Sequence, residues 1–233
     1  MRFRDIRIKT KFFLVFSLII VITIAAALWQ IKNLIEIGES AASVYKVRLL
    51  SMNYLLQADR DAYQSSIAIS QALNLKSKGS GSSEDIDKYI SAIDENYGQI
   101  GERFNKFMKL HLDSGGSKVG EFSQFSDNYL PMGKYTDDLK QLIKTGRTTE
   151  AYILYNGEYT KVFGETRDAM DKLTQITEAI AENEYNAIVS HNRSSILISI
   201  TVVILTIVIL LITGIISTLS FTSPIRSMLR FAE

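Results

Sequence analysis

Asp59, Arg60 and Asp61, with Tyr63 close behind them, form the densest group of charged side chains on one predicted helix. Acidic and basic groups this close together could bind a small charged solute. Consecutive residues point to different faces of a helix, however, so one ligand cannot contact all three charges equally. Two interpretations stay open at this point: a binding cluster, and a solvated face with salt bridges to neighbouring helices.

Arg48 differs from that cluster because it interrupts a stripe of apolar residues at helical spacing, between Val44 and Leu55. Burying an unpaired guanidinium is costly. Arg48 therefore needs a carboxylate partner, a water-filled gap or an anionic ligand. We favour the carboxylate partner.

The chain offers little that could carry out catalysis. His111 and His191 lie far apart, with no histidine or carboxylate at ligand spacing, and the chain has no cysteine. It has no glycine-rich phosphate loop, nucleophile elbow or HExxH pair. We therefore expect no enzyme activity, no metal and no cofactor.

Three tyrosines, Tyr152, Tyr155 and Tyr159, could be mistaken for a stacking platform. They recur at helical spacing within the apolar stripe of a predicted helix. Their expected role is therefore packing in the core and at its rim.

Two apolar runs, residues 12–29 and 196–216, are predicted to be transmembrane helices. The second run has 21 residues without a charge, and at about 1.5 Å per residue it spans roughly 31 Å, the thickness of a bilayer's hydrocarbon core. The first run also fits a cleavable signal peptide. An uncleaved anchor is favoured, because Trp29 falls where interfacial aromatic residues lie and the helical pattern continues past it.

The distribution of charge predicts the orientation in the membrane. Residues 1–11 and 217–233 together carry seven basic and two acidic residues, and basic residues beside membrane helices mark the cytoplasmic side. Residues 30–195 carry 23 acidic and 19 basic residues and offer no basic surface for nucleic acid. Both ends are therefore expected inside and the middle region outside.

Helical periodicity dominates the middle region. One stripe, at alternating spacings of three and four, contains Leu34, Ile37, Ala41, Val44, Arg48, Ser51, Leu55, Ala58, Ala62, Ser65, Ile69 and Ala72. A second stripe beside it contains Tyr45, Leu49, Met52, Leu56, Asp59, Tyr63, Ser66, Ser70 and Leu73. Two stripes exceed what one core face needs, which predicts a partner helix from a second copy of the chain.

Three breaks divide this region into four helices. The breaks lie at residues 76–84, 113–118 and 145–148. Ser82 or Ser83 is expected to cap the second helix, and Pro131 to kink or split the third. The first and fourth helices continue into the apolar runs. The predicted fold is all-α: an up-down-up-down four-helix bundle flanked by two continuous transmembrane helices.

This layout resembles the N-terminal half of bacterial methyl-accepting chemotaxis receptors. The phrase LLQADRDAYQSSIAISQAL, residues 55–73, is similar to first-helix segments of their four-helix-bundle sensor domains. Residues 223–233, around Pro224, are similar to the opening of a HAMP signal-relay domain. A whole HAMP domain and the methylated cytoplasmic hairpin are absent, so the resemblance covers the sensor half. It implies five segments: N-terminus 1–11, transmembrane helix 12–30, extracytoplasmic sensor 31–194, transmembrane helix 195–217, and connector with the start of HAMP 218–233.

The resemblance also implies a function. Such a receptor is a homodimeric, multi-pass protein of the bacterial inner membrane, which binds a small solute outside and relays helix motion to HAMP, here at Pro224. It reaches the cytoplasmic chemotaxis kinase and adaptor only through a C-terminal part that this chain lacks. Family members often bind anionic ligands through arginines on the distal half of the first helix. The matching residue is Arg60, with Asp59, Asp61 and Tyr63 beside it, and Arg48 is a further candidate.

Two alternative functions stay open. The same module could feed a histidine kinase or a diguanylate cyclase, because HAMP domains serve those outputs too. A membrane scaffold that senses nothing would form a dimer and respond to no solute.

Overall fold

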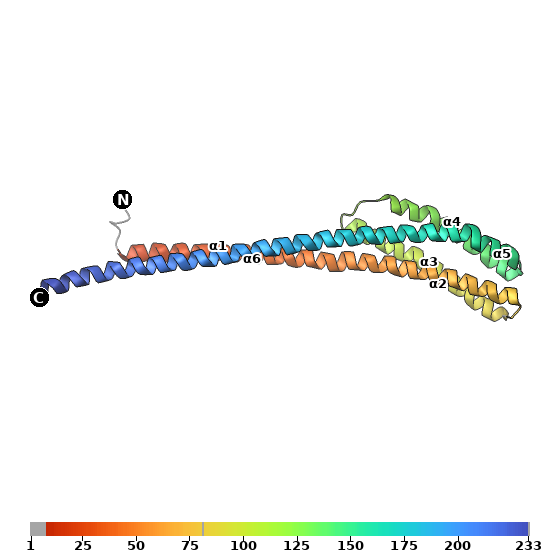
Figure 1. Cartoon of the computed structure of the whole chain (residues 1–233), viewed down its shortest axis with the longest axis horizontal. Coiled ribbons are helices and arrows are strands. Elements are labelled where there is room, and N and C mark those ends of the chain that lie inside the picture. Colours follow the sequence, from red (N-terminus) through yellow and green to blue (C-terminus); the bar gives the residue numbers. More distant parts are fainter. Residues whose placement is uncertain (1–7, 81, 233) are drawn as a thin grey trace. The chain divides into compact units, whose positions relative to one another are not determined.

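A computed structural model describes residues 8–80 and 82–232, and every element within these ranges is a helix. This confirms the predicted all-α class. The chain forms two compact units, the first made of residues 42–185 and the second of residues 8–41 and 186–232. Figure 1 labels the helices along the chain.

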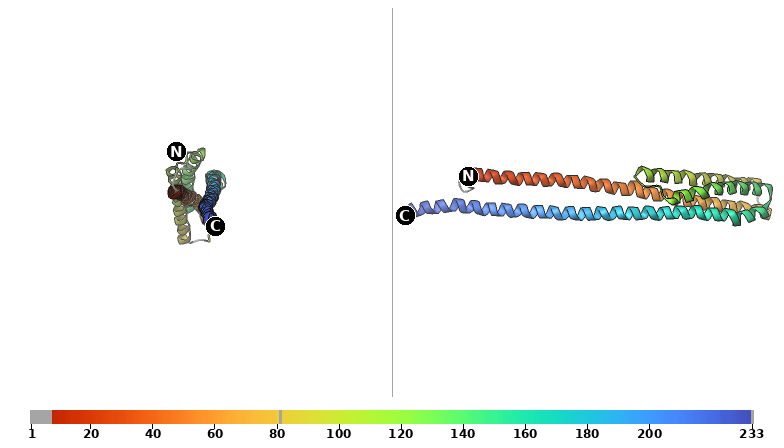
Figure 2. Two further views of the ribbon diagram at one scale, coloured as in Figure 1. Left: turned by 90° about the vertical axis from the view of Figure 1, so that its left-hand side faces the viewer. Right: turned by 90° about the horizontal axis from the view of Figure 1, so that it is seen from above.

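Residues 42–185 form a four-helix bundle. Its elements in chain order are η2 (Val44–Leu49), α2 (Leu50–Lys78), α3 (Ser83–Asp113), α4 (Gly120–Thr145), α5 (Thr148–Leu154), η3 (Tyr155–Tyr159) and the first part of α6 (Thr160–Ala232). Arg48 contacts Ser114 at one end of the bundle, and Asn74 contacts Tyr152 at the other. Neighbouring helices are therefore antiparallel, as the up-down-up-down prediction requires, and the right view of Figure 2 shows them running along one another.

The helices end where turn chemistry predicts. Gly79 and Gly146 follow α2 and α4 with φ angles of 64° and 75°, a left-handed conformation that costs glycine least. The Ser82 hydroxyl accepts a hydrogen bond from the Asp85 amide at 3.1 Å, and the Asp85 carboxylate accepts one from the Ser82 amide at 3.1 Å. This reciprocal capping box starts α3 and confirms Ser82 as its cap.

The first predicted stripe makes the core of the bundle together with apolar residues at helical spacing in the other helices. Buried members are Leu55, Ala62 and Ile69 of α2, Ile93, Ile100 and Phe107 of α3, Leu139 and Ile143 of α4, and Leu173 of α6. Truncating a residue of this kind, such as Leu55→Ala, would cost about 2–5 kcal/mol through lost burial and the cavity left behind. The bundle's stability therefore rests on the stripes that periodicity identifies.

Two helices differ in detail from the prediction. α4 runs through Pro131 as one element, so this proline does not split it. The fourth helix is interrupted at Gly157, whose φ of −99° and ψ of −105° are not helical, a break additional to the three predicted ones. From Thr160 onward the helix continues into the apolar run, as expected.

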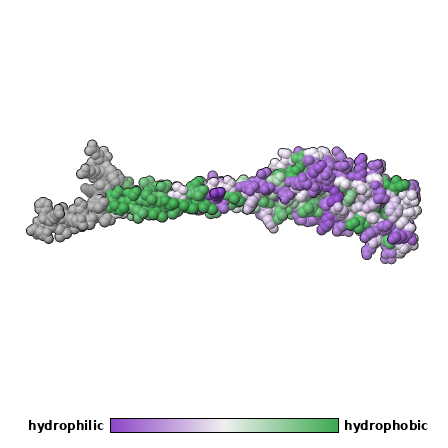
Figure 3. Space-filling view, viewed as in Figure 1, coloured by the Kyte–Doolittle hydropathy of each residue, from purple (hydrophilic) through white to green (hydrophobic). Residues whose placement is uncertain are grey.

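The second unit holds α1 (Ile8–Ser43) and the rest of α6. Both contain helical stretches long and apolar enough to cross a membrane, and these stretches are almost entirely exposed. Figure 3 shows hydrophobic residues gathered over them. Residues 1–7 of the predicted basic N-terminus lie outside the described residues. The α6 backbone stays helical through Pro224 to Ala232.

Two positions of the first stripe, Leu34 and Ala41, are wrong, because both are exposed. Leu34 was expected on the inner face of its helix but is 63% exposed, whereas the preceding Asn33 is only 5% exposed. Ile37, the next residue of the stripe, is half-buried as expected, and the preceding Glu36 is exposed. The inward face before η2 is therefore not displaced as a whole.

Candidate functional site

Arg48 is held by a carboxylate, as the sequence favours. Its side chain is only 8% exposed, and its Nη2 and Nε atoms donate to the two carboxylate oxygens of Glu184 in α6 at 2.8 and 3.1 Å. Its Nη1 donates to Ser114 Oγ, just after α3, at 3.1 Å. Ser114 Oγ in turn donates to the His111 carbonyl oxygen at 2.8 Å. One guanidinium thus joins three helices of the bundle.

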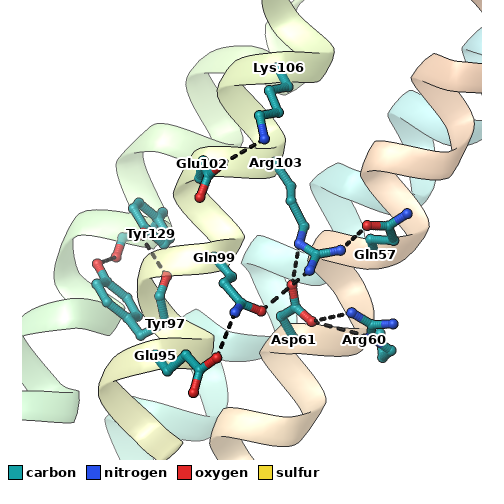
Figure 4. Close-up of polar contacts among 10 residues, drawn as sticks. All are labelled: Gln57, Arg60, Asp61, Glu95, Tyr97, Gln99, Glu102, Arg103, Lys106 and Tyr129. Atoms are coloured by element: carbon teal, nitrogen blue, oxygen red, sulfur yellow. Dashed lines mark hydrogen bonds and ion pairs between the residues drawn. The ribbon is translucent and has the colours of Figure 1, made fainter. Parts of the chain in front are cut away.

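Asp61 lies fully buried between α2 and α3 (Figure 4). Its Oδ2 pairs with Arg103 Nε at 2.6 Å, and its Oδ1 accepts from Arg60 Nη2 at 3.0 Å. Arg103 also donates to Gln57 and Gln99. A carboxylate this deep needs such charged partners, because desolvation would otherwise penalise its charge.

Asp59 faces α6 instead. It accepts hydrogen bonds from Arg167 Nε at 2.6 Å and Nη2 at 3.2 Å. The Arg167 guanidinium carbon lies 3.7 Å from the centre of the Tyr63 ring, close enough for a cation–π contact. Burial alone would lower the pKa of Arg167, but the hydrogen bond and charge of Asp59 raise the pKa above its usual value.

The charge cluster therefore divides as helix geometry requires. Asp59 pairs across to α6, Asp61 pairs across to α3, and the Arg60 side chain remains 55% exposed. The salt-bridge interpretation is confirmed for the two carboxylates. Among the ion pairs of the described residues, Arg60 has one partner, the Oδ1 atom of the adjacent Asp61. Much of its guanidinium therefore faces solvent.

A shallow groove of about 320 Å³ runs beside the Asp59–Arg167 pair, between α2 and α6. Leu55, Leu56 and Met170 give it an apolar floor, and Asp168 and Asp171 add acidic groups at its edge. Asp168 is itself paired with Lys172 at 2.7 Å. Most of the charge along the groove is thus already neutralised within the bundle.

The three tyrosines pack as expected. Tyr159 is buried, and its ring stacks on that of Tyr155 with centroids 5.4 Å apart. Tyr155 shares a hydrogen bond of 3.0 Å with the Ser66 hydroxyl, and the Tyr152 hydroxyl donates to Asn74 Oδ1 at 2.8 Å. They join the fourth helix to α2 and leave no open aromatic platform there.

The second predicted stripe divides into an outward and an inward part. Large apolar side chains of this stripe stay exposed along η2 and α2 at Tyr45, Leu49, Leu56 and Tyr63, and so does Ile67, four residues after Tyr63, which the predicted stripe did not include. Further along, Ser66 and Leu73 turn into the bundle and are buried. We call the five exposed residues the outer stripe.

Neither histidine gathers ligands for a metal. His111 is buried, and the Nε2 atom of its ring lies 3.0 Å from the Ser117 carbonyl oxygen. His191 Nε2 lies 4.0 Å from Glu36 Oε2. Within residues 8–80 and 82–232, no three histidine, aspartate or glutamate side chains cluster as a metal site.

The residues that complete these pairs, Arg103, Arg167 and Glu184, were not identified from the sequence. Each is adjacent in sequence to a residue that continues the helical spacing of its segment: Phe104 lies four residues after Ile100, Thr166 four after Val162, and Asn183 three after Ile180. A charged residue at such a flank can reach a charge on the neighbouring helix. Their positions beside such residues could have suggested these three charged residues, although periodicity does not say which helices are neighbours.

Comparison with known protein families agrees with the observed four-helix bundle. A family model described as a four-helix-bundle sensory module for signal transduction spans residues 5–191. The chain belongs to this family of sensory modules. No curated protein and no solved structure matches the chain.

Proposed function

We propose that this chain is the non-enzymatic sensor module of a chemoreceptor in the bacterial inner membrane. It binds a small solute outside and passes helix motion to a HAMP domain that begins near Pro224. The continuity of secondary structure supports this most. The first and last helices of the sensory bundle run without a loop into the two apolar stretches. A solute that binds the bundle therefore acts on helices able to cross a membrane.

The proposed signal is a change in equilibrium between two helix arrangements. A solute shifts such an equilibrium only by the difference in its affinity for the two. Small displacements of one helix against its neighbours are among the known switch modes. We expect α6 to carry the displacement, because it extends from the bundle through the second apolar run as one element.

The proposed module works as a homodimer. The outer stripe presents five large apolar side chains at near-helical spacing along one helix. Single exposed apolar residues are common on protein surfaces, but a continuous row of them is typical of an interaction surface. A partner helix could cover such a row. A second copy of the same helix is the proposed partner.

Arg60 is the proposed contact for an anionic solute, with Tyr63 beside it. Arg48, Asp59 and Asp61 already have charged partners within the bundle. Arg60 retains exposed donors, and a guanidinium binds carboxylates through paired hydrogen bonds.

Thermal unfolding of the full chain in lipid nanodiscs tests this proposal, with aspartate, malate, citrate and benzoate as probes. At least one probe should raise the melting temperature. Arg60→Ala should remove that shift, because a charge-assisted hydrogen bond contributes about 1.5–3 kcal/mol. Arg147→Ala is the matched control, since Arg147 is 58% exposed and pairs locally with Glu150. If the probe raises the melting temperature of Arg60→Ala as much as that of the unaltered chain, Arg60 does not bind the solute and serves only its salt bridge with Asp61.

A further inference from the structure

A cavity of about 590 Å³ lies between α1 and α6 within the second unit. Its lining comes from residues 22–30 of α1 and 198–207 of α6, which lie in the two apolar runs or directly beside them. Binding sites for small molecules are concave, mostly apolar and about 300–1,000 Å³ in volume, and a few polar groups in them orient the ligand. This cavity has the size and the lining of such a site.

The hydroxyl groups inside the cavity already have partners. Thr23, Ser199 and Thr206 each donate to the backbone carbonyl oxygen four residues earlier in their own helix, at 2.8 Å in all three cases. Apart from Trp29 and Gln30, the other lining residues are aliphatic. A hydrocarbon chain therefore fits most of this cavity better than a polar solute does.

Hydrogen-bond donors gather at one end of the cavity. Trp29 and Gln30 line this end with an indole N–H and an amide, and Asn33 follows one turn later on the same face of the helix. Asn33 is only 5% exposed, and its Nδ2 has no hydrogen-bond partner among the described residues. A buried amide without a partner costs free energy, and beside a membrane little water is available to satisfy it. This end of the cavity therefore lacks an acceptor.

The opposite helix closes the same end. The atoms His191 Nε2 and Glu36 Oε2 lie 4.0 Å apart across the two helices. Because α1 and α6 run in opposite directions (Figure 2), one turn nearer the cavity Asn33 is level with Ser195. Ser195 is only 8% exposed, so these two residues close the cavity together. Lys32 adds a positive charge beside them, and its Nζ pairs with Glu36 at 3.6 Å.

We propose that this cavity binds a free long-chain fatty acid, with the hydrocarbon chain between α1 and α6 and the carboxyl group at Asn33. A carboxyl group accepts hydrogen bonds whether or not it is ionised, so it supplies the acceptor that the Asn33 amide lacks. Residues 22–30 cover about 12 Å along α1, and the rest of the chain extends into the bilayer. The site rests on the proposed membrane location but requires no solute at Arg60.

Trp29 is the only tryptophan of the chain and lines the cavity, so its fluorescence reports binding. The full chain in phosphatidylcholine nanodiscs is titrated with stearic acid that carries a nitroxide quencher near its carboxyl end. We expect quenching that saturates and that unlabelled palmitic acid reverses at constant total lipid. The same nitroxide on phosphatidylcholine should quench in proportion to its content in the bilayer, without saturation and without competition by palmitic acid.

Two variants test the two parts of the site. Asn33→Leu removes the amide, so it should weaken the saturable binding about three- to tenfold, as expected for one lost hydrogen bond. Asn192→Leu, at an exposed position of α6, is its matched control and should bind like the unaltered chain. Ala27→Phe fills the cavity and should abolish saturable quenching, whereas Ala41→Phe, at an exposed position of α1 outside the cavity, should not.

Three outcomes would overturn the proposal. Quenching of the unaltered chain that does not saturate would show that no fatty acid binds, and equal binding by Asn33→Leu would exclude the carboxyl group from Asn33. If a helix of a second copy fills the cavity, palmitic acid would not compete, and Ala27→Phe would convert dimers to monomers. Failure of the membrane location itself is distinguishable, because labelled phosphatidylcholine would then not quench Trp29 either.

Discussion

Tyr97 of α3 and Tyr129 of α4 exchange hydrogen bonds: each hydroxyl donates to the other residue's backbone carbonyl oxygen at 3.0 Å. Their rings stack with centroids 4.7 Å apart and planes 6° from parallel. Gly101 and Gly133 each lie four residues after one of these tyrosines and leave the space that the opposite hydroxyl occupies. The pair fastens two antiparallel helices through a repeated Tyr-x-x-x-Gly pattern.

Adding a methyl group at either glycine should destabilise the bundle. The Cβ of Gly101→Ala would lie 2.6 Å from the Tyr129 hydroxyl, and that of Gly133→Ala would overlap the Tyr97 hydroxyl. Overpacking of this kind costs about 1–3 kcal/mol. Gly98→Ala, in the same helix with no atom within 4 Å of the new Cβ, is the control and should be neutral or stabilising. Urea unfolding measures the free energy of unfolding of all three variants. Equal losses of stability in Gly98→Ala and Gly101→Ala would contradict this explanation.

The same pair should make the bundle sensitive to alkali. Burial raises the pKa of Tyr97 and of Tyr129 above the ordinary tyrosine value. Because the folded pKa exceeds the unfolded pKa of about 10, the stabilisation is complete below that pH and declines as pH rises through it. The free energy of unfolding should therefore fall above about pH 10. Tyr97→Phe should reduce this decline, whereas Tyr185→Phe, at an exposed position, should not.

The two carboxylates of the charge cluster should differ in their effect on stability. Asp61→Asn leaves Arg103 without its buried partner, which costs about 3–5 kcal/mol. Asp59→Asn breaks a pair whose side chains are 31% and 27% exposed, and it should cost about 1 kcal/mol or less. Urea unfolding of the two variants measures both losses in the free energy of unfolding. Equal losses would show that burial does not govern these pairs.

The outer stripe should control self-association. Leu49→Glu and Leu56→Glu place charges where the second copy is proposed to pack, so they should yield monomers in detergent at concentrations where we expect the unaltered chain to dimerise. Leu130→Glu, at an exposed position on α4, is the control. Light scattering after size-exclusion chromatography measures the mass. A dimer that survives both changes would place the interface elsewhere.

Periodicity and turn chemistry predicted the helices well, because both depend on local sequence. The capping box at Ser82 and the glycine after α2 follow from neighbouring residues. The π turn η2 does not, since the apolar spacing continues through it without a gap. Leu34, which the same spacing placed on the inner face, is exposed.

The candidate site was only partly predictable for a similar reason. A charged residue inside an apolar stripe needs a partner, a water-filled gap or a ligand, and for Arg48 the favoured carboxylate partner is the one that the structure shows. Glu184 lies 136 positions away along the chain, and no spacing rule connects the two. Likewise, helix geometry separated Asp59 from Asp61 but could not name Arg167 or Arg103, because these contacts depend on which helices pack together.

The central claim, that a solute bound outside acts through α6, is tested most directly by joining residues 1–233 to the cytoplasmic kinase-control region of a characterised chemoreceptor. Thr177 is buried in α6, and a proline there would break the helix at a cost of about 3 kcal/mol. We predict that a probe solute changes kinase activity in the unaltered fusion and in Thr177→Ala. In Thr177→Pro the solute should still raise the melting temperature but no longer change kinase activity. A full kinase response in Thr177→Pro would contradict the account.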